Sequence, residues 1–249
     1  MNTRTIVVGG LLFLPVGGTT WAQTAPPQTR GFVSVNGGYQ ATANNFHDGA
    51  TFRRNAEDAR FDTDYTVKAG PAFDVAGGAV PWRHLGIGVG VSRFSLATPT
   101  HLTGSIPHPF FFNRPRTVGG DVGGLKREEL AVHVQARLVA DIGRRIQLMI
   151  FGGPSFFQLK QDVVTDFTYA DDYPYDEASY RSANSGTQTA SKIGINAGGD
   201  FAFFFTRQLG VGALVQFAGT TMPLHSASGG TADVKVGGVQ AGAGLRLRF

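Results

Sequence analysis

The sequence contains no cysteine and little charge. Without cysteine, the 249-residue chain can form neither disulfide bonds nor thiol-based sites, so packing and hydrogen bonds alone must hold the fold. Charged residues make up 16% of the chain and the formal net charge is +4, with Lys and Arg spread along the sequence rather than clustered. This distribution argues against nucleic acid as a partner.

The sequence also lacks an apolar run long enough for a membrane-spanning helix. Its longest apolar stretch, residues 6–16, falls short of the ~20 residues that such a helix needs. Arg4 precedes this stretch, and the small residues Thr20 and Ala22 follow it, which is typical of an export signal cleaved after Ala22. We predict a signal peptide at residues 1–22, a flexible lead-in at 23–30 and a single domain at 31–249; a membrane anchor is the alternative for the first segment.

Glycine, by contrast, is abundant. The 35 Gly residues, together with 20 Phe, disfavour helices and favour an all-β fold. Eight segments alternate apolar residues with Gly or polar residues, which is the period of a β-strand. They are residues 31–40, 61–79, 85–95, 130–138, 146–164, 193–205, 209–217 and 241–249.

The connections between these segments alternate in length. Those after the first, third and fifth segments are long, including residues 98–127 and 165–190, whereas those after the second, fourth and sixth are short turns. Short turns at one rim and long loops at the other are typical of a transmembrane β-barrel with apolar residues outside and polar residues inside. A soluble lipocalin-type barrel shares the period of two, but its outer face would carry solvated Lys, Glu and Thr rather than glycines.

The last segment ends in "GLRLRF", with Leu245, Leu247 and Phe249 on one face of the strand. With this ending and this topology, residues 31–249 resemble the bacterial outer-membrane β-barrel family that includes the transmembrane domain of outer membrane protein A. The resemblance implies an eight-stranded antiparallel up-and-down barrel with short periplasmic turns and long extracellular loops, in the outer membrane of a Gram-negative-type bacterium. It further implies contact with outer-membrane lipid and lipopolysaccharide, and recognition of Leu245, Leu247 and Phe249 by the barrel-assembly machinery.

Several charged residues fall on the face predicted to point inward. Because an eight-stranded barrel is just wide enough for its side chains to fill, we expect these charges to pair as an ionic plug; an ion path is the alternative. The predicted cluster comprises Lys68, Asp74, Arg137, Asp200 and Arg246.

The loop "SIPHPFFFNRPR" carries three consecutive phenylalanines and two arginines. Exposed aromatic side chains often mark a binding surface, but we expect the three phenylalanines to fold down over the barrel mouth as a lid, with the arginines at lipopolysaccharide phosphates or nearby acids. The candidate contact residues are Phe110, Phe111, Phe112, Arg114 and Arg116. We expect a second loop, rich in Asp between residues 166 and 177, to pair with these arginines, since its spacing does not match a helix–loop–helix calcium site.

No catalytic motif is recognisable in the sequence. Five of the six histidines fall in predicted turns or loops, and His133 is expected to face inward with no serine at a recognisable spacing. We therefore predict no enzymatic activity, cofactor or metal, and a structural or surface-interaction role. A barrel that binds or transports a small solute is the alternative, followed by a lipid-modifying enzyme.

Overall fold

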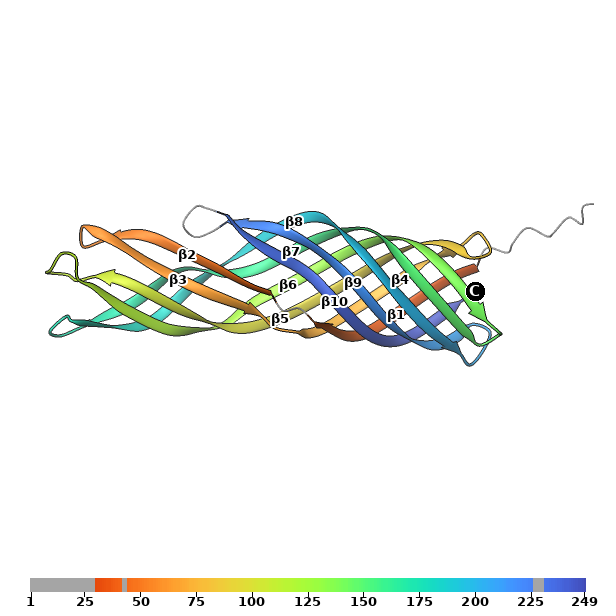
Figure 1. Cartoon of the computed structure of the whole chain (residues 1–249). Coiled ribbons are helices and arrows are strands. Elements are labelled where there is room, and N and C mark those ends of the chain that lie inside the picture. The colour runs from red at the N-terminus through yellow and green to blue at the C-terminus, as the bar shows by residue number, and fades with distance from the viewer. Residues whose placement is uncertain (1–29, 42–43, 226–230) are drawn as a thin grey trace, which may run out of the picture.

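The computed structural model describes residues 30–41, 44–225 and 231–249, and the regular structure in them is β-strand (Figure 1). The strands are β1 Arg30–Ala41, β2 Asn44–Arg54, β3 Glu57–Val67, β4 Gly70–Val80, β5 Leu85–Pro107, β6 Pro115–Ile142, β7 Ile146–Asp172, β8 Glu177–Phe204, β9 Leu209–His225 and β10 Thr231–Arg248. Within these ranges, no helix has the length and apolarity to cross a membrane. The predicted signal peptide lies outside the described residues, as does the lead-in up to residue 29.

The ten strands form an eight-stranded antiparallel barrel because two barrel strands are each made of two segments. β3 and β4 both pair with β5, and β1 and β2 run alongside them, β1 pairing with β4 and β2 with β3. The order is β2-β3-β5-β4-β1-β10-β9-β8-β7-β6, and the additional β5–β6 pairing closes the ring. The predicted eight-stranded up-and-down fold is confirmed.

One end of the barrel carries short turns and the C-terminus (Figure 1). Residues 81–84, 143–145 and 205–208 form the connections there. The first and last strands meet at the same end, where the backbone N–H of Gly31 donates to the carbonyl of Phe249 at 2.8 Å and the N–H of Phe249 donates back at 3.0 Å. The terminal residue therefore takes part in closing the ring.

At the opposite end, the predicted long connections are present, and they are paired strands for most of their length. The β5–β6 ladder continues to Pro107–Pro115 and the β7–β8 ladder to Asp172–Glu177. These stretches lack outward aliphatic residues, so they do not show the pattern of a lipid-facing strand. Together with β2 and β3 they form a rigid extension, which comprises residues 44–67, 97–126 and 161–191 (Figure 1).

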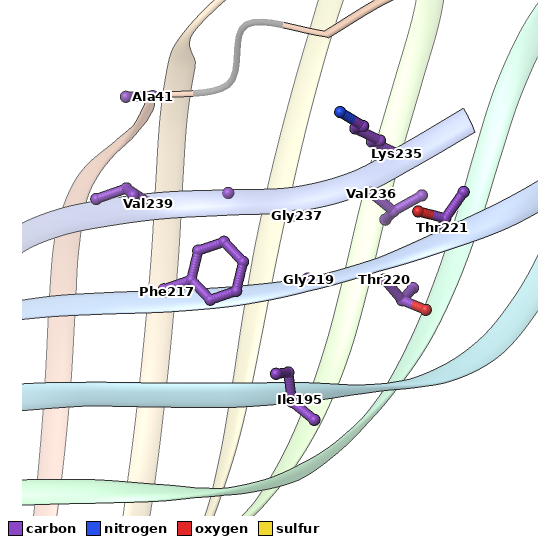
Figure 2. A pocket seen from close by; sticks show the side chains of 11 residues that line it. Ala41, Ile195, Phe217, Gly219, Thr220, Thr221, Lys235, Val236, Gly237 and Val239 are labelled. Atoms are coloured by element: carbon purple, nitrogen blue, oxygen red, sulfur yellow. The ribbon is translucent and has the colours of Figure 1, made fainter. Parts of the chain in front are cut away.

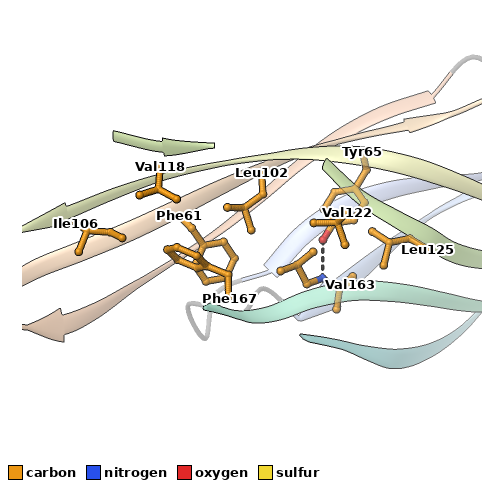
Figure 3. Packing of buried hydrophobic residues seen from close by; sticks show 10 residues of the cluster. Phe61, Tyr65, Leu102, Ile106, Val118, Val122, Leu125, Val163 and Phe167 are labelled. Carbon is orange, nitrogen blue, oxygen red and sulfur yellow. Dashed lines mark hydrogen bonds between the residues drawn. The ribbon is translucent and has the colours of Figure 1, made fainter. Parts of the chain in front are cut away.

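The extension has an apolar core of its own (Figure 3). The Phe61 and Phe167 rings pack edge-to-face at 5.6 Å, and the backbone N–H of Val164 donates to the Tyr65 hydroxyl at 2.8 Å. The buried members are Phe61, Tyr65, Leu102, Ile106, Val118, Val122, Leu125, Val163, Val164 and Phe167. The interior thus changes along the barrel axis, from a short-turn half in which buried polar groups lie beside a small apolar cluster of Phe32, Val80, Val139 and Met149 to the apolar core of the extension.

Lys68 lies where two strand segments change phase, and the prediction that it points inward is wrong. In β3 the odd-numbered residues are buried, whereas in β4 the buried residues include the even-numbered Asp74 and Ala76. Lys68 and Ala69 separate the two strands and shift the alternation by one residue, so the Lys68 side chain is exposed. A one-residue shift moves every following side chain to the other face.

Candidate functional site

The interior near the short-turn end contains a buried ion pair. Arg246 on β10 donates from Nε to both carboxylate oxygens of Asp200 on β8, at 3.0 and 3.1 Å, and its Nη2 also bonds to Asp200. Both side chains are buried. On β9, the strand between them, Gly212 leaves room for the guanidinium, since a Cβ there would lie 2.8 Å from Arg246 Nε. Two of the predicted cluster residues are therefore direct partners.

Arg137 and Asp74 are also inside the barrel, but each contacts a neutral group. Asp74 accepts a hydrogen bond from Asn36 Nδ2 at 3.1 Å. The Arg137 guanidinium lies 4.4 Å from the centre of the Phe32 ring and bonds to Gln135 through Nη2. The structure thus places four of the five predicted cluster residues in the lumen, with Lys68 outside.

A histidine–serine cluster, which the sequence analysis missed, fills the middle of the bore. His133 is fully buried, and its Nε2 lies 2.9 Å from Ser92 Oγ and its Nδ1 2.7 Å from Ser155 Oγ. Asn196 Nδ2 donates to Ser155 at 2.8 Å, and Gln135 donates to Asn196 at 3.0 Å. The serines come from β5 and β7, so only the register between strands brings them to His133. Both ring nitrogens are occupied by hydroxyls within a packed interior.

A second buried pair, also missed, lies beneath the β9–β10 hairpin. Arg127 Nε donates to Glu129 at 2.6 Å, and both side chains are buried. Glu129 also accepts from Gln40 at 3.0 Å and from the backbone N–H of Gly237 at 2.8 Å, while Arg127 Nη2 donates to the Lys235 carbonyl at 2.7 Å. Inward alternation on β6 could have revealed the pair, because residues 127, 129, 131, 133, 135 and 137 share one face. This network ties β6 to β10.

The tip of the extension presents aromatic side chains. Phe110, Phe111 and Phe112 are 68%, 58% and 72% exposed, so the prediction that they fold down as a lid is wrong. The Phe110 ring packs edge-to-face on Tyr175 of the β7–β8 turn at 5.2 Å. The buried His108 accepts backbone N–H bonds from Phe110 and Phe111 at its Nδ1, at 3.1 and 3.2 Å. The aromatic residues thus protrude from an ordered turn.

The two arginines of this turn hold it against the acidic turn. Arg114 lies 3.0 Å from Asp176, and Arg116 lies 2.6 Å from Asp171. The predicted pairing of the basic loop with the acidic loop is confirmed. Arg116, however, is buried, so its assignment as a contact residue is wrong: it also donates to the carbonyls of Tyr175 and Glu177 and fixes the two turns together.

The outer surface of the short-turn half is an aliphatic belt. Its exposed residues come from every barrel strand and include Val35, Phe73, Ile87, Val89, Val134, Ile150, Phe156, Ile195, Phe201, Val215, Val239, Leu245 and Leu247. Exposed apolar side chains around a closed ring with a polar interior would be unfavourable in water and favourable in lipid. The chain is a transmembrane β-barrel. Such barrels, with short turns on the periplasmic side, belong to the bacterial outer membrane, and the extension therefore projects from the cell.

No protein-family model matches the chain, and no curated protein matches it either. Solved structures of similar fold include the outer membrane protein OprG from Pseudomonas aeruginosa, with 10% identity over 88% of this chain and 95% of that chain and a TM-score of 0.46. The outer membrane protease OmpT from Escherichia coli matches with 7% identity over 88% and 97% and a TM-score of 0.43. Neisserial surface protein A matches with 9% identity over 88% and 97% and a TM-score of 0.39. At these identities the likeness does not extend beyond the overall fold.

The terminal strand provides a test of assembly. Leu245, Leu247 and Phe249 all point outward and are exposed, as expected for lipid-facing residues. Deleting Phe249 removes both backbone hydrogen bonds to Gly31 and the last outward aromatic ring. We expect the deleted protein to be exported but poorly inserted, as measured by the fraction that shifts on a heat-modifiability gel. An unchanged folded fraction would contradict an assembly role for this residue.

The extension also contains a titratable contact suited to measurement. The hydrogen bond between His47 Nδ1 and Asp64, at 2.8 Å, raises the pKa of His47 above its ordinary value, partial desolvation opposes the rise, and Asp62 adds to it. Because the folded pKa is raised, the stabilisation is present below about pH 6.5 and is lost as the pH rises through the folded pKa. We expect Asp64→Asn to lower the pKa of His47 in an NMR titration. The control Asp58→Asn, on the same strand but paired with Arg53, leaves it unchanged.

Proposed function

We propose that this outer-membrane barrel is a non-enzymatic surface-interaction protein whose extension presents an aromatic contact site. The observation that supports this most is the tip: three consecutive exposed phenylalanines sit on a turn that Arg116–Asp171 and Arg114–Asp176 hold in place. Exposed aromatic side chains on an ordered support lose little entropy on binding and bury a large area. Outer-membrane lipid and lipopolysaccharide surround the barrel, and the tip is free to contact another surface.

The filled interior of the barrel supports a structural role for its charged residues rather than the passage of a solute. Buried side chains fill successive levels of the bore: the Asp200–Arg246 pair, the His133 cluster, the Arg127–Glu129 network and the apolar core of the extension. An eight-stranded barrel leaves no further space once such side chains are in place. We therefore propose that the charged groups form a structural plug. Steady conductance of the wild-type protein in planar bilayers would favour the solute-transport alternative instead.

The His133 cluster supports the absence of catalysis as part of the proposal. A catalytic histidine must reach a proton on the substrate, yet His133 is fully buried and both ring nitrogens face serine hydroxyls. Among the described residues there is also no group of three or more His, Cys, Asp or Glu side chains that could hold a metal ion. The interior histidine thus serves packing and hydrogen bonding.

A binding assay on whole cells tests the contact site. Cells that display the wild-type protein are expected to attach to alkyl-coated beads more than to uncoated hydrophilic beads. The triple substitution of Phe110, Phe111 and Phe112 by Ser is expected to lower the attachment at least about fivefold, since each buried aromatic ring contributes on the order of 1 kcal/mol or more.

Trp82→Ser is the matched control for this assay. Trp82 is also an exposed aromatic residue, 62% accessible, but it lies in a short turn at the periplasmic end. Its substitution should leave attachment unchanged at equal surface expression. Equal attachment of the triple variant and the wild type would contradict the proposed role of the tip.

A further inference from the structure

The outer wall has a niche where the ladders on both sides of the β9–β10 hairpin stop. Among the residues that the structure describes, the β8–β9 ladder ends at Ile195–Gly219 and the β1–β10 ladder at Ala41–Val239. Just at this level, Gly219 and Gly237 face each other across the hairpin, and neither carries a side chain. A Cβ at the buried Gly237 would lie 2.0 Å from the Ala218 carbonyl oxygen, so no larger residue fits there without a shift of the backbone. The resulting niche has a volume of about 430 Å³ (Figure 2).

The niche is amphipathic. Figure 2 shows Phe217 and Val239 at one end and Thr220, Thr221 and Lys235 at the other. The apolar end continues into the aliphatic belt, where Ile195, Phe217 and Val239 are exposed to the bilayer. The polar end lies toward the extension. The niche thus runs from an apolar to a polar end in the same direction as a lipid of the outer leaflet runs from acyl chains to headgroup.

The back of the niche is closed, so it does not lead into the bore. Met222 and Val234 of the same hairpin are fully buried and pack with Phe157 and Leu159 of β7. The Arg127–Glu129 network bonds to the backbone of Lys235 and Gly237 from the inner side. A ligand therefore enters from the outer wall and not from the bore.

All lysines of the chain mark one level of the barrel. Each is exposed and lies within a few residues beyond the last exposed apolar residue of its strand, at the boundary between belt and extension. They are Lys68, Lys126, Lys160, Lys192 and Lys235. Lysine at this depth attracts the anionic groups of lipids while its alkyl stem remains against apolar surface. This lysine ring indicates the level of the headgroup phosphates.

Two members of the ring meet at the niche. Lys235 lines it directly, and Lys192 Nζ donates to the Thr221 carbonyl at 2.7 Å, with Thr221 paired opposite Lys235 in the ladder. We propose that the niche binds a phosphate-bearing lipid of the outer leaflet, with acyl chains over Ile195, Phe217 and Val239 and a phosphate at Lys235. The missing side chain at Gly219 leaves room for the junction between acyl chains and headgroup, which a larger residue at this position would fill.

A lipid titration followed by native mass spectrometry tests the proposal. The delipidated barrel in mild detergent is titrated with diphosphorylated lipid A, with the same lipid lacking phosphates, and with inorganic phosphate. We expect retention of the diphosphorylated lipid, with an apparent affinity about tenfold lower in Lys235→Gln, the loss typical of one charge-assisted contact. Gly219→Leu should lower the affinity as much, because the new side chain fills the niche. Its Cβ would lie 3.2 Å from the movable Phe217 ring and 3.4 Å, an ordinary contact distance, from the Val236 carbonyl oxygen.

Two matched variants test whether the effects are specific to the niche or follow from any loss of a lysine or any added side chain on the outer wall. Lys160→Gln removes a lysine of the same ring on β7, and Gly37→Leu fills open space beside an outward glycine of β1, with nothing within 4 Å of its Cβ. Both should bind as the wild type does. The proposal is overturned if the phosphate-free lipid binds equally, if inorganic phosphate alone displaces the lipid, or if Lys235→Gln and Lys160→Gln behave alike. If Gly219→Leu does not fold, as judged on a heat-modifiability gel, the comparison of Lys235→Gln with Lys160→Gln decides, since both lysines are exposed.

Discussion

Asp200→Asn is expected to lower the free energy of unfolding in detergent by about 3 to 5 kcal/mol, because it leaves the buried Arg246 without its counter-charge. The guanidinium has little room to move, since it packs against Gly212, and little access to water. Arg246→Met should have a comparable effect by leaving the Asp200 carboxylate unpaired. The unfolding midpoint in urea, measured by the loss of β-sheet circular dichroism, gives the comparison with the wild type.

The double variant Asp200→Asn with Arg246→Met should be more stable than either single variant. Removing both charges removes the desolvation cost together with the attraction, whereas a single removal keeps the cost alone. Arg53→Gln is the control, because the Arg53–Asp58 pair is exposed at 4.0 Å and such pairs contribute less than about 1 kcal/mol. If both single variants kept wild-type stability, or if they conducted ions steadily, the plug would be the wrong description of this interior.

Glu129→Gln is expected to have the second large effect, again about 3 to 5 kcal/mol, since Arg127 would remain buried without a carboxylate. Glu129 accepts hydrogen bonds from Arg127, Gln40 and the Gly237 backbone. The NH₂ group of a glutamine in its place would face one of these N–H donors, so that hydrogen bond would be lost. In the described residues, the end of the β9–β10 hairpin beyond Gly219 and Gly237 forms backbone ladder hydrogen bonds only between its own two strands. We therefore expect the loss of stability to appear there first. Hydrogen exchange should accelerate at residues 220–225 and 231–238.

The neighbouring Glu128→Gln is the matched control. Glu128 faces outward and pairs with Lys126 and Arg93 at the surface, where water screens the charges. Its substitution should change neither the unfolding midpoint nor the exchange of the hairpin. Faster exchange in both variants, or in neither, would show that the buried network does not hold the hairpin.

Much of the barrel could be predicted because alternation is a local property. A strand that faces lipid on one side and a narrow lumen on the other needs an apolar residue at every second position, whatever its partners are. The segments around Leu85 to Val91 and Leu245 to Phe249 carry that signal in their own residues. The inward position of Arg137, Asp200 and Arg246 follows from the same parity. The exposure of the tip phenylalanines could not be decided in this way, since a lid and a protruding turn have the same sequence.

The features that the alternation of residues could not predict depend on the register between neighbouring strands. The one-residue shift at Lys68 moves that side chain outward, and only the pairing of β3 and β4 with the same strand β5 reveals it. Register likewise brings Ser92 and Ser155 to His133, and Gly219 opposite Gly237. The sequence by itself determined a lipid-facing barrel with a polar interior, because each strand encodes its own two faces. Only the tertiary structure decided which interior charges pair, how the extension packs and where the wall is indented, because these depend on contacts between strands far apart in the chain.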